Sequence, residues 1–226
     1  MRRFLFFLLL ATVLPAVFSC AKKPVEPAEP RIETGDLLFI GIPMNYWDDS
    51  MADAIADATA AEGDTVNFIH TAILEVDPEG TVWVIDATLA HGVDRHPLDT
   101  LLKDFALKDG SPETLLVMRL KDNGDAVRFV EQAKGFVGEE YDLYFKGGNG
   151  RHYCTELVYD TYIASDGTHL FESVPMNFKN KAGEMPAYWT KLFAMLGEEV
   201  PQGEPGTNPQ MMLASENLIP VLYLNE

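Results

Sequence analysis

Residues 67–88 constrain the fold most, because two β-rich runs there are separated by a short turn. Residues 67–76 (NFIHTAILEV) and 81–88 (TVWVIDAT) are rich in β-branched and aromatic side chains, which favour strands. Between them, residues 77–80 (DPEG) have the composition of a turn. The two runs are therefore predicted to pair as an antiparallel hairpin.

The other predicted elements mix strands and helices without a strict β-α-β order, which favours an α+β domain. The chain of 226 residues is long enough for one such domain and a leading segment. Strands are expected at residues 35–40, 114–120 and 218–224, and helices at 50–60, 97–106, 125–137, 153–164 and 188–196.

The N-terminus differs from the rest of the chain. Arg2 and Arg3 precede an apolar run, residues 4–18, that is too short to span a bilayer comfortably. With Ser19 before Cys20, the pattern predicts a lipoprotein signal over residues 1–19 and a lipid-acylated Cys20. The alternatives are an ordinary signal peptide and a buried helix with a chance cysteine.

The following residues have the composition of a tether. Residues 21–33 (AKKPVEPAEPRIE) contain three prolines among alanine and charged side chains, which favours an extended, solvated segment. We therefore expect a lipidated cysteine and tether at 20–33 and a folded domain at 34–226. The protein is expected in the cell envelope, anchored to a membrane on the periplasmic side or at the cell surface.

The charge of the chain argues against one class of partner. The formal net charge is −18, and no basic stripe offsets it. Such a surface repels phosphate backbones, so no nucleic-acid partner is expected.

Cys154 is the candidate nucleophile. If Cys20 is acylated, Cys154 is an unpaired thiol in an exported protein, which requires an explanation. It lies at the start of a predicted helix, just after a glycine-rich turn at residues 146–150. The N–H groups and positive partial charge of a helix start favour a thiolate and can bind an oxyanion. The alternative is a buried, inert cysteine.

A cysteine nucleophile needs a base, and the chain has five histidines. His91 and His96 flank a loop rich in glycine and aspartate, His169 lies in a turn, and His152 is too close to Cys154 along the chain. His70 is embedded in the first hairpin strand. From the pattern alone, a polar side chain on an exposed strand face is the simpler interpretation of His70.

The best candidate for the third residue is Asp86. It interrupts the apolar run 82–85 on the strand expected to pair with that of His70, and a buried acid needs a partner. Glu75 is a weaker candidate because it lies toward the far end of the His70 strand. No HExxH or CxxC spacing is present, so neither a metal nor a cofactor is expected.

The order of several segments resembles the permuted papain-fold amidases of the YiiX/YaeF type, in the NlpC-like cysteine peptidase superfamily. These segments are GDLLF, F-x-HTAI, VWVIDAT-x-x-x-GV-x-x-x-PL, YD-x-x-F, YCTELVYDTY, PMNFKN and VPQGEPGTNP. The resemblance implies a circularly permuted papain-like fold, with an antiparallel sheet packed against the helix that bears the nucleophilic cysteine.

The resemblance also assigns site residues. Its triad falls on Cys154, His70 and Asp86, although the family usually has glutamate at the last position. Glu156, Tyr141 and Tyr153 fall at positions that support the helix or line the cleft. The implied activity is that of a cysteine amidase or peptidase acting through an acyl-enzyme. Its substrate would be an amide in a small cell-wall peptide or a lipid-linked amide.

Two other functions remain open at this point. An acyltransferase or thioesterase would use the same Cys-His pair, because it also passes through an acyl-enzyme. A non-catalytic lipoprotein that binds cell-wall fragments would keep the site only as a relic.

The leading segment gives a first prediction. Cys20→Ser removes the acylated thiol, so the chain should be released in soluble form or stall during processing. Membrane fractionation followed by immunoblotting measures this outcome. Unchanged recovery in the membrane fraction would count against lipid attachment.

Overall fold

The computed structural model describes residues 30–61 and 63–225. The predicted signal segment, Cys20 and residues 21–29 of the predicted tether lie outside the described residues. Within the described ranges, no helix is both long enough and apolar enough to cross a membrane.

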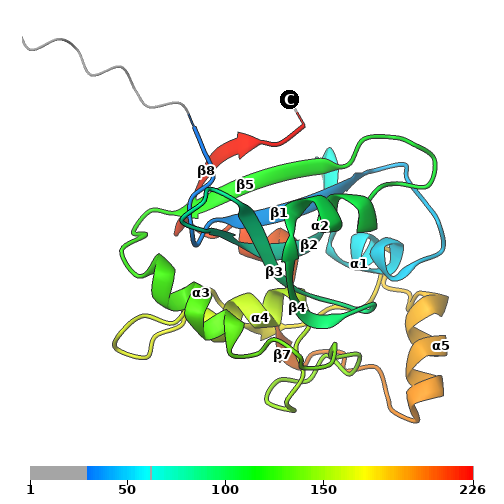
Figure 1. Ribbon diagram of the computed structural model, residues 1–226. Coiled ribbons are helices and arrows are strands. Elements are labelled where there is room, and N and C mark those ends of the chain that lie inside the picture. The colour runs from blue at the N-terminus through cyan, green and yellow to red at the C-terminus, as the bar shows by residue number, and fades with distance from the viewer. Residues whose placement is uncertain (1–29, 62, 226) are drawn as a thin grey trace, which may run out of the picture.

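A six-stranded antiparallel sheet forms the centre of the domain (Figure 1). The predicted hairpin is present as β2 and β3. In spatial order the strands are β4 (Gly92–Pro97), β3 (Val82–Thr88), β2 (Val66–Val76), β1 (Leu37–Pro43), β5 (Thr114–Leu120) and β8 (Leu218–Tyr223).

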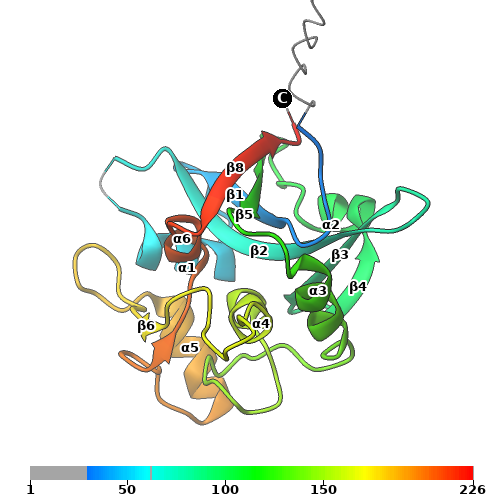
Figure 2. The ribbon, with the colours of Figure 1, turned by 90° about the vertical axis from the view of Figure 1, so that its left-hand side faces the viewer.

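Helices cover both faces of the sheet (Figures 1 and 2). One face packs against α3 (Ala126–Lys134), α4 (Cys154–Thr161) and α6 (Pro209–Leu213), and the other against α2 (Leu98–Asp104). A further apolar cluster joins α1 (Met51–Thr59) to α5 (Ala187–Leu196). The short strands β6 (Val174–Pro175) and β7 (Pro205–Gly206) pair with each other.

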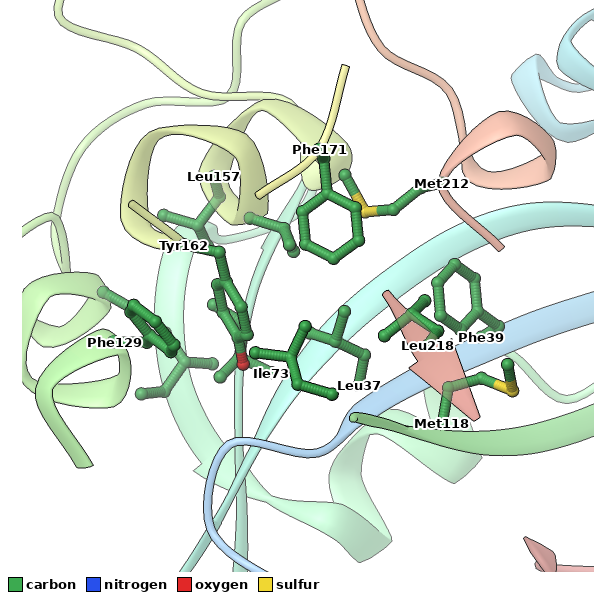
Figure 3. Close-up of a cluster of buried hydrophobic side chains, with 14 of the residues drawn as sticks. Leu37, Phe39, Ile73, Met118, Phe129, Leu157, Tyr162, Phe171, Met212 and Leu218 are labelled. Carbon is green, nitrogen blue, oxygen red and sulfur yellow. The ribbon is translucent and has the colours of Figure 1, made fainter. Parts of the chain in front are cut away.

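The sequence of β1 reflects this burial on two sides. Its segment LLFIGIP is almost uninterrupted apolar sequence, as expected of a strand covered on both faces. Leu37 and Phe39 belong to the cluster on the face covered by α3, α4 and α6 (Figure 3), whereas Leu38 and Ile40 pack toward α2. Successive side chains therefore serve opposite layers.

The structure differs from the predicted elements in several places. Residues 92–97, expected as part of a loop, form strand β4, whose mostly polar sequence GVDRHP lacks the alternation of a half-buried strand. Helix α6 and strand β7 lie in or just after a segment rich in proline and glycine that was expected to be a loop. Helix α3 ends before Gly135 rather than at residue 137.

Helix α4 is also shorter than the predicted segment 153–164, and packing gives the reason. Tyr162 has φ −89° and ψ 69°, which leaves the helical region. Its side chain is fully buried, and its hydroxyl donates to the carbonyl oxygen of Gly35 at 3.0 Å. Ending the helix at Thr161 therefore allows the next side chain to enter the core (Figure 3).

Packing of α4 against the sheet gives a second prediction. Leu157 is fully buried between α4 and the sheet, so Leu157→Ala should lower the free energy of unfolding by roughly 2–5 kcal/mol. Denaturant unfolding measures the loss. The control Val127→Ala, at a side chain that is 65% exposed on α3, should change it by less than ~0.5 kcal/mol. Equal effects would show that α4 is not held by this packing.

Candidate active site

Cys154 is the first residue of α4. Tyr153 before it is extended, with φ −92° and ψ 169°, and its N–H donates to the Glu156 side chain at 3.3 Å. The carboxylate thus holds the chain where it enters the helix, a frequent arrangement at helix starts. Cys154 is 5% exposed and lines two adjoining cavities. Cys154 therefore lies at the start of a helix, as predicted.

His70 lies on β2 beside an irregularity in the sheet. Ile40 of β1 pairs with His70, but the next residue, Gly41, pairs with Phe68, so Ile69 is the extra residue of a bulge. A side chain on Gly41 would collide with Val66, which explains the glycine at this close approach. Bulges bend a strand and change the direction of neighbouring side chains.

Asp86 lies on β3 and contacts His70 directly. Its Oδ2 is 2.7 Å from Nε2 of His70, and the Asp86 side chain is 1% exposed. Although aspartate is one methylene shorter than glutamate, it reaches the ring. Burial opposes ionisation of Asp86, but hydrogen bonds from His70 and His96 lower the pKa of this carboxyl below its usual value. Asp86 is therefore a carboxylate at neutral pH.

The Cys154 thiol and the His70 ring face the same cavity. Burial disfavours the charged imidazolium, but the charge of a Cys154 thiolate and the hydrogen bond with Asp86 together raise the pKa of His70 to about 10. Phe105, just after α2, packs against the ring at a centroid distance of 4.5 Å. These contacts favour the imidazolium form of His70.

His96 is a member of this cluster that the sequence analysis did not single out. Its Nε2 is 3.0 Å from Oδ1 of Asp86, and the residue is buried. It was expected beside a loop, but it lies on β4, where Asp94 pairs with Asp86. Because residues two apart share a face of a strand, Asp94 and His96 both lie on the face of Asp86. Had residues 92–97 been predicted as a strand paired with β3, the position of His96, two residues after the partner of Asp86, would have placed it near Asp86.

The three predicted supporting residues have different positions. Tyr141 lines both cavities, and Tyr153 lines the smaller one. The Tyr153 hydroxyl accepts from the backbone N–H of Thr207 at 3.0 Å. Glu156 is buried at the start of α4, where burial and the charge of Asp142 raise its pKa to about 7.

The other candidates lie in separate ion pairs. Glu75 contacts Arg95 at 2.7 Å and Lys134 at 2.6 Å, near the far end of β2. His152 lies between Glu139, at 2.8 Å, and Asp160, at 3.3 Å. Both residues are therefore engaged away from His70.

A cavity of about 530 Å³ opens beside Cys154 and His70. Most of its lining is apolar, from β1, α1 and the segments around Leu89 and Phe105. At its rim, Lys108 and Asp48 form an ion pair of 2.7 Å. A smaller cavity of about 60 Å³ also contacts Cys154 and is lined by aromatic residues such as Phe145 and Trp189.

The family model described as "permuted papain-like amidase enzyme, YaeF/YiiX, C92 family" matches residues 31–222. The chain belongs to this family. It is therefore an enzyme of the cysteine hydrolase type, with the permuted papain-like fold. No curated protein matches the chain.

A solved structure supports the fold of this C92 member. The crystal structure of metalloprotein yiiX from Escherichia coli O157:H7 is similar over 84% of this chain and 96% of its own, with a TM-score of 0.64 and 22% sequence identity. At this identity, the similarity concerns the fold alone.

That relative is described as a metalloprotein, but the residues of this C92 site do not fit a metal ion. Within the described ranges, no group of three histidine, cysteine or acidic residues has the arrangement of a metal site. Both oxygens of Asp86 face imidazole nitrogens at hydrogen-bond distance, so a cation there would replace these contacts.

The pairing of Cys154 and His70 gives a third prediction. In Cys154→Ala the thiolate charge is absent, so the pKa of His70 should fall from about 10. NMR titration of ¹⁵N-labelled histidine measures this value in both proteins. An unchanged pKa of His70 in the variant would contradict an ion pair between His70 and Cys154. The resonances of His91, which is exposed, provide the internal reference.

Proposed function

We propose that this protein is a cysteine amidase in which Cys154 is the nucleophile, His70 the general acid and base, and Asp86 the residue that orients His70. The observation that carries the proposal is the buried 2.7 Å contact between His70 and Asp86, beside a cavity that the Cys154 thiol also lines. The arrangement has the three roles of a nucleophile triad.

The acylation step follows from the two ring nitrogens of His70. Because Nε2 faces Asp86, Nδ1 is the nitrogen left for proton exchange with Cys154. The thiolate attacks the carbonyl carbon of the amide, and a C–S bond forms. His70 then gives its Nδ1 proton to the amide nitrogen, the C–N bond breaks, and the amine leaves a thioester on Cys154.

Hydrolysis of the thioester restores the enzyme. His70, now neutral, takes a proton from water, whose oxygen attacks the thioester carbon. The C–S bond breaks, the acid leaves, and the thiolate-imidazolium pair forms again. With an amine or alcohol in place of water, the same intermediate would give acyl transfer instead.

The start of α4 supplies a binding site for the negative oxygen of both tetrahedral intermediates. The first N–H groups of a helix have no partner within the helix, and Cys154 is the first residue of α4. Donors aimed at the developing charge stabilise the transition state more than the substrate. The same N–H groups favour the thiolate before attack.

The cavity lining supports an amide with an apolar portion. Side chains such as Ile42, Ile55 and Leu107 line the larger cavity, and they favour apolar groups over charged ones. A small cell-wall peptide with apolar side chains or a lipid-linked amide meets this requirement. The signal-like sequence of residues 1–20 supports action in the cell envelope on a lipid anchor.

The fourth prediction tests Cys154 as an activated thiol. Wild-type protein should react with iodoacetamide at about pH 6, where an ordinary thiol with a pKa of ~8.5 is almost entirely protonated. His70→Ala should lose this reactivity by roughly 10- to 100-fold. Peptide mass spectrometry at Cys154 measures the rate against pH.

Two controls sharpen this experiment. Asp86→Ala should keep part of the reactivity at low pH, because Asp86 orients His70 and does not react. Cys154→Ala identifies any label on Cys20. If Cys154 reacts like an ordinary thiol in both wild type and His70→Ala, or fails to react in the folded protein, it is a structural cysteine and the proposed activity is wrong.

A further inference from the structure

Asp86 is shared by two histidines from neighbouring strands. Its Oδ2 is 2.7 Å from Nε2 of His70 on β2, and its Oδ1 is 3.0 Å from Nε2 of His96 on β4. All three residues are at least nine-tenths buried. The proposed triad accounts for His70 but gives no role to His96.

The contacts of His96 indicate its protonation state. A carboxylate can only accept hydrogen bonds, so Nε2 of His96 must carry a hydrogen toward Asp86. Nδ1 of His96 lies 3.2 Å from the carbonyl oxygen of Pro97, which also only accepts. With a hydrogen on both nitrogens, the ring is a cation. Consistently, its hydrogen bond with Asp86 raises its pKa, although burial acts in the opposite direction.

Few elements of the fold place charged residues near the His96 ring. The negative charges of Asp86 on β3 and Asp94 on β4 raise the pKa of His96. Helix α2 packs against both strands, and its charged residues are exposed: Asp99, Lys103 and Asp104. Around His70, the charged partners are Asp86 and Cys154.

Other charged residues on the elements packed against β2 are engaged locally. Asp53 of α1 accepts from the N–H groups of Asp48 and Ser50, and Lys134 of α3 pairs with Glu75.

We propose that His96 is a positioning residue of this active site, which fixes the Asp86 carboxylate against His70 and offsets its negative charge. The inference rests on the proposed function, since it assigns His96 a part in the same reaction. A carboxylate held by one donor can rotate about its side-chain bonds. A second donor on the other oxygen fixes the plane in which Asp86 meets His70.

The charge of His96 also affects proton transfer. In the acyl-enzyme the thiolate charge is gone, and His70 must take a proton from water and release it again. An isolated Asp86 carboxylate in this buried place would hold the imidazolium too firmly for a good acid. A cation on its other side weakens that attraction. His96 therefore keeps the proton affinity of His70 closer to neutral pH.

The fifth prediction separates these roles with two variants and p-nitrophenyl acetate as the probe substrate. His96→Ala removes both the donor and the charge, so kcat should fall by roughly 10- to 100-fold, the value of one charge-assisted hydrogen bond, with little change in KM. His96→Gln can keep a donor without the charge. It should recover only part of kcat, because the donor is restored but the charge is not, and the pKa of His70 in NMR titration should rise above that of wild type.

His91 provides a matched control for the His96 variants. His91→Gln, at an exposed histidine near the start of the same strand, should leave kcat and the His70 titration unchanged. A merely structural His96 would lower the unfolding midpoint in its variants and leave kcat and the His70 titration of the folded protein as in wild type. If His96→Ala does not fold, His96→Gln alone decides through the His70 titration.

The failure of this inference is distinct from that of the proposed function. If wild-type Cys154 is not acylated by p-nitrophenyl acetate, both fail together. If wild type is acylated and turns over, but both His96 variants match it in kcat and His70 titration, only the role of His96 is wrong.

Discussion

One buried carboxylate determines how three strands can meet in this protein. Asp86 is 1% exposed, and an unpaired charge there would cost several kcal/mol. Its two oxygens are satisfied by His70 and His96, which come from the strands on either side of its own. Removing one histidine leaves one buried oxygen of Asp86 without its hydrogen bond, so β2, β3 and β4 are coupled at this point beyond their backbone pairing.

The helix that carries Cys154 depends on a different kind of interaction. Helix α4 is held by apolar contacts, with Leu157 and Val158 fully buried against the sheet. Tyr162 ends the helix and enters the same core. The thiol is thus positioned by packing and the base by hydrogen bonds. The two sets of contacts meet at the cavity.

The sequence allowed the core of this arrangement to be predicted for physical reasons. The hairpin of β2 and β3 has strong strand composition and a clear turn, so the proximity of His70 and Asp86 followed from pairing. Cys154 follows a glycine-rich turn, which locates a helix start. The family resemblance added the permuted order, which composition alone does not specify.

The remaining parts depend on contacts that local sequence does not encode. Strand β4 has little hydrophobic alternation because its residues serve polar contacts, and His96 was missed with it. The bulge at Ile69 follows from the register between β1 and β2. The cavity combines segments far apart in the chain, around Ile42, Phe105, Tyr141 and Tyr188, and only the folded chain brings them together.

The direction of β1 has a consequence for access. The chain enters the fold beside Ile32, which packs near the beginning of β1, while Ile42 near its other end lines the cavity. A strand of seven residues spans about 23 Å. The described chain therefore enters the fold near one end of β1, and the cavity lies near the other end. A segment that joins this fold to an anchor would therefore leave the domain about one strand length away from the Ile42 side of the cavity.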